Sequence, residues 1–159
     1  MPKSPINIVW FKRDLRFTDH EPLYRALASE IPTLLVYFFE PSLIAYPDSD
    51  VRHWRFVHES LVEMQGRLED RNGILYLFHS EVIPVFQALA KAYEIKSIFS
   101  HEEIGNGLSF ERDKVVAAFC ASEKIAWRET STGGVVRRLK SRKAWQQHWD
   151  KTMRSEQFF

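Results

Sequence analysis

Apolar runs and helix-like stretches alternate along this chain. Five of the apolar runs are short, as strands buried on both faces of a sheet are. They predict strands at Ile6 to Phe11, Thr33 to Phe39, Leu75 to Phe78, Ser97 to Ser100 and Ile125 to Glu129. Because strands that alternate with helices are typical of β-α-β units, the pattern predicts a parallel sheet.

Between these runs, apolar side chains recur every three or four residues, which is the helical period. The clearest example extends from Val51 to Leu68. Its apolar stripe consists of Trp54, Val57, Leu61, Met64 and Leu68. The stripe predicts a helix that packs one face on the sheet, with Trp54 in the core.

Two more helices are predicted further along the chain. One carries the stripe from Val82 to Tyr93 with Ser80 as its N-cap, and the next carries Phe110 to Phe119 with Ser109 as its N-cap. Right-handed crossovers place such helices on both faces of a parallel sheet. We therefore predict an α/β fold, a three-layer, Rossmann-like, doubly wound parallel sheet of about five strands with helices on both faces.

Charged side chains follow the predicted strands at their carboxyl ends, the edge where ligands of such sheets bind. The candidate cofactor-binding residues are Lys12, Arg13, Asp14, Phe39, Glu40, Glu102 and Glu103. Several of them also have a structural interpretation. Asp14 could pair with a nearby arginine and fix the turn, Phe39 could pack in the core, and the two glutamates could belong to a solvated turn.

Motifs of several enzyme classes are missing from the sequence. It contains no G-x-x-x-x-G-K-[ST] loop, no G-x-G-x-x-G after the first strand and no G-x-S-x-G elbow. The six histidines are scattered, with no H-E-x-x-H pair and no cysteine partner for a zinc site. We therefore predict no metal site and no catalytic residues in this chain.

The composition fits one globular domain. The chain has 159 residues, of which 45% are hydrophobic, and its apolar runs are far shorter than the roughly 20 residues of a membrane helix. Its start lacks the apolar region of a secretory signal. The single cysteine, Cys120, allows no internal disulfide and is expected in the core. These features favour a cytoplasmic protein without a membrane partner.

Charge is divided unevenly along the chain. The stretch from Arg137 to Arg154 holds seven basic residues and one acidic residue, a net charge of +6. The remainder holds fifteen basic and twenty acidic residues, a net charge of −5. Such a basic segment is typical either of a solvated helix face or of an arm that binds an anionic surface.

The segment after the first predicted strand reads W-F-K-R-D-L-R from Trp10 to Arg16, followed by Asp19, His20 and Leu23. It resembles the W-F-R-R-D-L-R-x-x-D-N-x-x-L opening of the photolyase and cryptochrome family. Arg52 to Leu68 resembles that family's R-x-x-F-x-x-E-S-L-x-x-L helix, and the segment H-E-E-I-G-N-G-L-S-F-E-R-D-K-V-V that begins at His101 resembles its acidic turn and R-D-x-x-V helix.

This resemblance implies an amino-terminal antenna domain at residues 1–132 and a basic inter-domain linker at residues 133–159. In the family this domain can hold a light-harvesting chromophore, which is a folate, a deazaflavin or a flavin, and pass excitation energy to FAD in a helical domain. The resemblance implies that the helical FAD domain, FAD and damaged DNA belong to the full-length protein. The chain alone is expected to lack catalysis, and its uncapped apolar end, Phe158 and Phe159, predicts truncation.

Two other functions remain open from the sequence. The first is a stand-alone α/β protein that binds a small molecule or nucleotide. The second is an interaction module whose basic tail docks an acidic partner or nucleic acid, which should weaken steeply with added salt. Repair and blue-light signalling are not distinguished by the sequence, because that choice is made around the flavin.

Overall fold

A single parallel sheet of five strands organises the protein, whose computed structural model describes residues 2–159. The strands are β1 (Pro5–Phe11), β2 (Thr33–Phe38), β3 (Leu75–Phe78), β4 (Glu94–His101) and β5 (Ala126–Thr130), in the spatial order β3-β2-β1-β4-β5. In the centre, Val9 of β1 lies opposite Leu35 of β2 and Phe99 of β4. The chain adds β2 and β3 on one side of β1 and then crosses over to add β4 and β5 on the other side. The boundary between β1 and β4 is therefore the topological switch point of the sheet.

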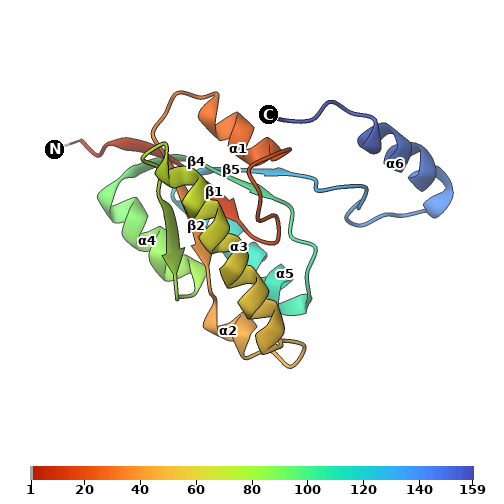
Figure 1. The fold of residues 1–159 in the computed structure, drawn as a ribbon, viewed down its shortest axis with the longest axis horizontal. Coiled ribbons are helices and arrows are strands. Elements are labelled where there is room, and N and C mark those ends of the chain that lie inside the picture. Colours follow the sequence, from red (N-terminus) through yellow and green to blue (C-terminus); the bar gives the residue numbers. More distant parts are fainter. Residues whose placement is uncertain (1) are drawn as a thin grey trace.

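Helices cover both faces of the sheet (Figure 1). They are α1 (Glu21–Leu27), α2 (Pro41–Ile44), α3 (Val51–Glu69), α4 (Val82–Ala92), α5 (Gly107–Ser122) and α6 (Trp145–Met153), with a short 3-10 turn at Arg142–Ala144. One apolar core packs α1 and α3 against the sheet through Leu23 and Leu61, and the other packs α4 and α5 through Phe86 and Val116. The predicted three-layer α/β fold is confirmed.

The structure corrects both predicted N-caps. Helix α4 has Glu81 at its N-cap, and the Ser80 hydroxyl donates to the Glu81 carbonyl instead of capping the helix. Helix α5 begins three residues before the expected position, after Asn106, whose side chain accepts a hydrogen bond from the Ser109 backbone N–H. Asn106 has the extended backbone of an N-cap, so Ser109 falls inside the first turn.

Cys120 is in the core, as predicted. It is 3% exposed, and burial raises the pKa of its thiol to about 11. Trp54 is not in the core, which corrects that prediction. It is half-buried, and its Nε1 donates to the Ser49 hydroxyl at 2.6 Å.

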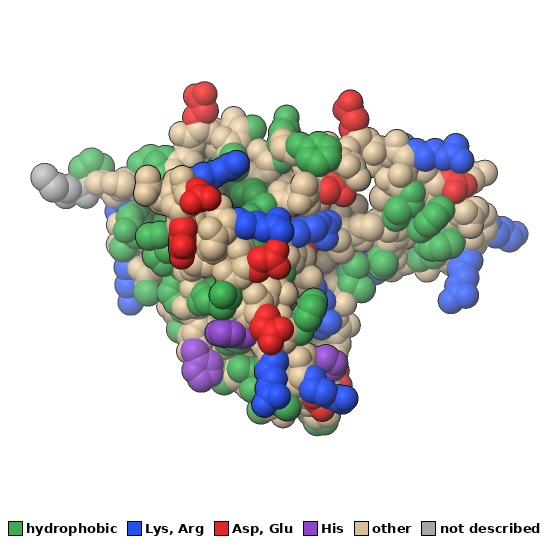
Figure 2. Space-filling view, in the orientation of Figure 1, with side chains coloured by type: hydrophobic (Ala, Val, Ile, Leu, Met, Phe, Trp, Pro, Cys, Tyr) green, Lys and Arg blue, Asp and Glu red, His purple; other side chains and the backbone are tan. Residues whose placement is uncertain are grey.

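After β5 the chain forms an arm that carries α6 away from the sheet (Figure 1). Trp145 and Trp149 of α6 lie beside each other, and the Trp145 Nε1 donates to the Gly134 carbonyl. The tail then returns to the body, where the Asp19 backbone N–H donates to the Phe158 carbonyl at 2.8 Å. In Figure 2, basic and apolar side chains gather at the α6 end. No helix within residues 2–159 is long and apolar enough to cross a membrane.

Candidate functional site

A cavity of about 680 Å³ opens at the carboxyl ends of the central strands. This volume is within the ~300–1,000 Å³ usual for small-molecule sites. The cavity lies beside the switch point between β1 and β4, where ligands of doubly wound sheets bind. The lining side chains that determine its chemistry are Trp10, Lys12, Arg13, Arg16, Tyr37, Phe38, Glu40, Trp54, Glu103 and Arg112.

Aromatic side chains form part of the cavity wall. Trp10 is buried and meets Phe38 edge to face, with 6.0 Å between ring centroids. Trp54 enters from the first turns of α3, which explains why it is half-buried although it belongs to the apolar stripe. Large flat side chains of this kind provide surfaces on which a planar ring can pack.

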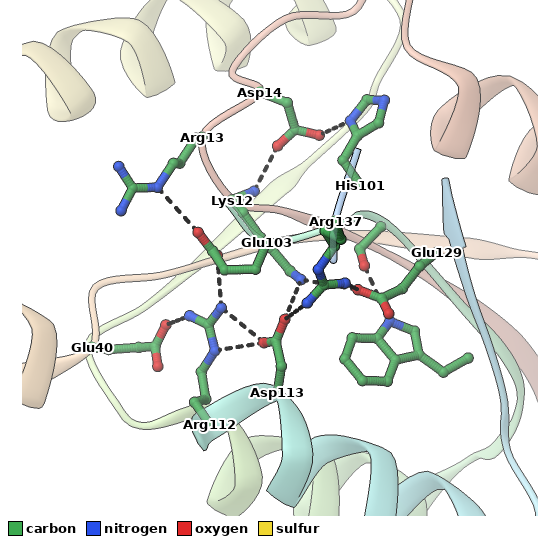
Figure 3. A network of polar contacts seen from close by, with 12 residues as sticks. Lys12, Arg13, Asp14, Glu40, His101, Glu103, Arg112, Asp113, Glu129 and Arg137 are labelled. Carbon is green, nitrogen blue, oxygen red and sulfur yellow. Dashed lines mark hydrogen bonds and ion pairs between the residues drawn. The ribbon is translucent and has the colours of Figure 1, made fainter. Parts of the chain in front are cut away.

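The polar part of the cavity is organised around Arg112 of α5 (Figure 3). Its guanidinium lies 2.5 Å from the Glu40 carboxylate, 2.8 Å from the Glu103 carboxylate and 2.9 Å from the Asp113 carboxylate. Glu103 is held from the other side by Arg13, at 3.1 Å. Because these carboxylates are almost completely buried, the network fixes the orientation of each one.

Burial and ion pairing compete at the two glutamates of this network. Burial raises the pKa of Glu40 to about 7, although the positive charge of Arg112 acts in the opposite direction. Burial would also raise the pKa of Glu103, but the charges of Arg112 and Lys12 outweigh it and lower that pKa below its ordinary value. The two carboxyls therefore differ: Glu103 stays ionised, whereas Glu40 exchanges its proton near neutral pH.

Lys12 extends the network toward the arm. Its side chain is 5% exposed, and its Nζ lies 3.3 Å from the Asp113 carboxylate and 3.8 Å from that of Glu129. The same Nζ lies 4.3 Å from the centroid of the Trp10 ring, a cation–π geometry. Burial lowers the pKa of Lys12. Arg137 of the arm reaches Glu129 at 3.5 Å, so the residues after β5 contact the same network.

Asp14 pairs with two histidines and not with an arginine, which corrects the structural interpretation given above. Its Oδ2 lies 2.6 Å from His20 Nε2 and 2.5 Å from His101 Nδ1. Burial would raise the pKa of Asp14, but the hydrogen bonds from His101 and His20 lower it far below its usual range. Asp14 thus joins the end of β1 to α1 and to β4.

The Asp14, His20 and His101 cluster also has the composition of a metal site. The Leu23 backbone N–H donates to His20 Nδ1, which assigns the ring proton to Nε2 and directs it to Asp14. A metal on Nε2 would require a proton on Nδ1 and would remove the side-chain cap of α1. The geometry therefore favours a structural role for this cluster.

Six of the seven predicted site residues line at least one of two cavities. Lys12, Arg13, Glu40 and Glu103 line the large cavity. Asp14 and Glu102 line a separate small cavity of about 80 Å³, together with Lys12, Arg13 and Glu103. Phe39 packs on Tyr37 and Trp54 and is not among the residues that line either cavity. A role in binding a cofactor remains a prediction for all seven residues.

Sequence reasoning missed Arg112, Trp54 and Arg16 as cavity residues. Arg112 could have been found, because it is the arginine of the R-D-x-x-V segment that follows the acidic turn.

Gly105 keeps that turn tight. A Cβ at Gly105 would collide with the Ser109 hydroxyl and lie 2.7 Å from the Glu103 carboxylate.

Comparison with known proteins gives consistent results. A family model described as DNA photolyase matches residues 7–153. The chain is 32% identical over 104 residues, 62% of its length, to a cryptochrome DASH of Solanum lycopersicum, and 31% identical over 105 residues, 63% of its length, to a cryptochrome DASH of Synechocystis. These matches span 18% and 22% of the two relatives, so the chain corresponds to about a fifth of their length.

Solved structures show the same fold. An archaeal photolyase from Sulfolobus tokodaii, described as holding two FAD molecules with the implication of a novel light-harvesting cofactor, superposes with a TM-score of 0.73 at 20% identity. It covers 96% of this chain, which corresponds to 35% of that protein. A class III photolyase from Agrobacterium tumefaciens gives a TM-score of 0.71 at 24% identity, over 88% of this chain and 28% of that protein.

Proposed function

Because this chain belongs to the DNA photolyase family, we propose that its α/β body is an antenna module that binds a planar light-absorbing chromophore. The cavity at the switch point carries this proposal. It combines aromatic side chains in its lining, of which the half-buried Trp54 is the most accessible, with ionised groups at fixed positions, at Glu103 and Arg112. Fixed walls suit a light-harvesting role, since energy transfer depends on the distance and orientation of the ring.

The chemistry of the lining fits the ring systems of flavins, deazaflavins and folates. Trp54, which is half-buried, offers apolar surface to a flat ring. The carboxylate of Glu103 can accept hydrogen bonds from ring N–H groups. Glu40 can accept when ionised or donate when protonated, because its pKa of about 7 permits both states near neutral pH.

The arm after β5 supports a second part of the proposal, which is scaffolding. Residues 133–159 form the inter-domain linker of this proposal, and their α6 exposes Trp145, Trp149 and Met153. An exposed apolar stripe on a helix that lies within a basic segment suits docking onto another domain. We propose the helical FAD domain as that partner, with light-driven repair of damaged DNA or blue-light sensing as the activity of the whole protein.

The direct test is a titration of the purified chain with FMN, a deazaflavin and 5-formyltetrahydrofolate, followed by absorption and by tryptophan fluorescence. Binding of one compound should shift its near-ultraviolet or blue band and quench tryptophan emission. A Trp54→Ala variant, which removes a half-buried lining residue, should weaken the same binding, whereas Phe110→Ala, on the exposed side of α5, should not.

The result also separates the other hypotheses. If no compound binds while a nucleotide such as ATP raises the melting temperature, the chain is a nucleotide-binding protein and the antenna proposal is wrong. If the only ligand is an acidic polymer whose affinity falls steeply with salt, the basic tail is the functional surface.

A further inference from the structure

Arg16 occupies the mouth of the large cavity with its guanidinium fixed in place. It lies in the turn after β1 and lines both the large and the small cavity. Its Nε donates to the Thr18 carbonyl at 3.1 Å, and its Nη2 donates to the Asp19 carbonyl at 3.1 Å. Within residues 2–159 no acceptor is paired with its Nη1. The backbone thus orients the guanidinium plane and leaves part of its donor edge free.

The other cations of the cavity already have carboxylate partners. Lys12 pairs with Asp113, Arg13 pairs with Glu103, and Arg112 pairs with three carboxylates. Arg16 has no carboxylate within 4.0 Å among the described residues. The mouth of the cavity therefore carries a positive charge that the protein itself does not neutralise.

The acidic groups nearby are directed elsewhere. Glu40 and Glu103 are held by arginines, and Asp48 accepts a hydrogen bond from the Asn106 side chain at 3.2 Å. The carboxylate of Asp19, next to the carbonyl that holds Arg16, accepts from the Phe158 backbone N–H at 3.2 Å. No competing carboxylate among residues 2–159 therefore occupies the free edge of Arg16.

We infer that the cavity selects chromophores that carry an oxyanion group, either phosphate or carboxylate, and that Arg16 is the residue that binds this group. The inference rests on the proposed function and narrows it to charged members of the three chromophore classes. A guanidinium that is already oriented loses little freedom when it binds an oxyanion. At a partly exposed site, one charge-assisted hydrogen bond of this kind corresponds to about a tenfold gain in affinity.

FMN and riboflavin provide the sharpest test, because they share one ring system and differ by a phosphate group. Titrations followed by flavin fluorescence should show that the wild-type chain binds FMN about tenfold more tightly than riboflavin. Arg16→Gln should abolish this preference, so that FMN and riboflavin bind the variant with equal affinity. Arg25→Gln, a matched change of an exposed arginine on α1, should keep the preference.

A second pair of ligands identifies the source of the oxyanion. If 5-formyltetrahydrofolate loses affinity when its glutamate is removed, and Arg16→Gln abolishes that difference, the oxyanion that Arg16 binds is a carboxylate. If only the flavin pair shows a preference, the oxyanion that Arg16 binds is a phosphate. Equal affinities within both pairs would overturn the inference and leave the antenna proposal standing, whereas absence of binding by every compound would overturn both.

Arg16 also holds the turn from Thr18 to Asp19, so its replacement can disturb folding. The ratio of FMN to riboflavin affinity within each variant corrects for this, since misfolding lowers both affinities together. The wild-type chain supplies an independent measurement. Its preference for FMN should decrease as sodium chloride is raised from 50 to 500 mM, and a preference that is independent of salt would overturn the role of Arg16.

Discussion

Replacing Glu40 with glutamine should make the stability of the protein less dependent on pH. Burial raises the pKa of this carboxyl from 4.5 to about 7. The folded protein therefore binds the Glu40 proton more tightly than the unfolded chain does, and stability falls as pH rises from 4.5 to about 7. At about 1.4 kcal/mol for each pKa unit, the loss is about 3 kcal/mol. Glutamine has the same shape and can still accept from Arg112, but it does not titrate.

Urea denaturation of the wild type and of Glu40→Gln at pH 5, 6, 7 and 8 measures this effect. Between pH 5 and pH 8, the difference in free energy of unfolding should shift by about 2.5 kcal/mol in favour of the variant, because part of the change occurs below pH 5. Glu59→Gln, on the exposed face of α3, should show no such shift. A difference that stays constant with pH would refute the reasoning, because it would mean that Arg112 outweighs burial and keeps Glu40 ionised throughout.

Three further predictions concern other side chains of the protein. Asp14→Asn should lower the free energy of unfolding at pH 7 by about 3 to 5 kcal/mol, because two imidazoles lose a buried carboxylate. The pKa of Asp14 is lowered on folding, so this penalty should shrink as pH falls below 3.8, and a constant penalty would contradict it. Trp54→Ala should cost about 2 kcal/mol and weaken chromophore binding, since only part of the ring is buried, and a loss above about 3 kcal/mol would indicate a core residue. Cys120 should react with Ellman's reagent at pH 8 only as the protein unfolds, because its pKa is about 11, and rapid labelling of the native protein would contradict its burial.

Most of the fold could be predicted from the sequence because a sheet covered on both faces leaves unbroken apolar runs. Each of the five predicted strands overlaps an observed strand. The largest error is at β4, which begins at Glu94 and not at Ser97. Glu94 and Lys96 are exposed there, and charged side chains at the start of a strand hide its true beginning. The N-cap of α5 failed for a related reason, since Asn106 and Ser109 are both good caps and only the backbone shows which one is used.

The site was less predictable because helices contribute to it. Residues that follow a strand could be identified from their position in the sequence. Three residues predicted in this way, Lys12, Arg13 and Glu103, line the cavity. Trp54 has the same spacing as the core residues of α3, and periodicity does not separate a side chain that faces a cavity from one that faces the sheet. One of the two partners of Asp14, His101, lies 87 positions away along the chain, and no local pattern reports such a contact.

The largely buried network of charges in and beside the cavity is difficult to explain as a device for folding alone. The cations are Lys12, Arg13, Arg112 and Arg137, and the carboxylates that they contact are Glu40, Glu103, Asp113 and Glu129. Buried ion pairs generally contribute little more than apolar packing would, and two apolar cores already hold the helices on the sheet. A role in ligand binding would account for these charges. Glu40 allows a test of this role, because its pKa of about 7 makes its charge change near neutral pH. If FMN affinity changes between pH 6 and pH 8 in the wild type but not in Glu40→Gln, the network takes part in binding, and identical profiles would leave it a structural feature.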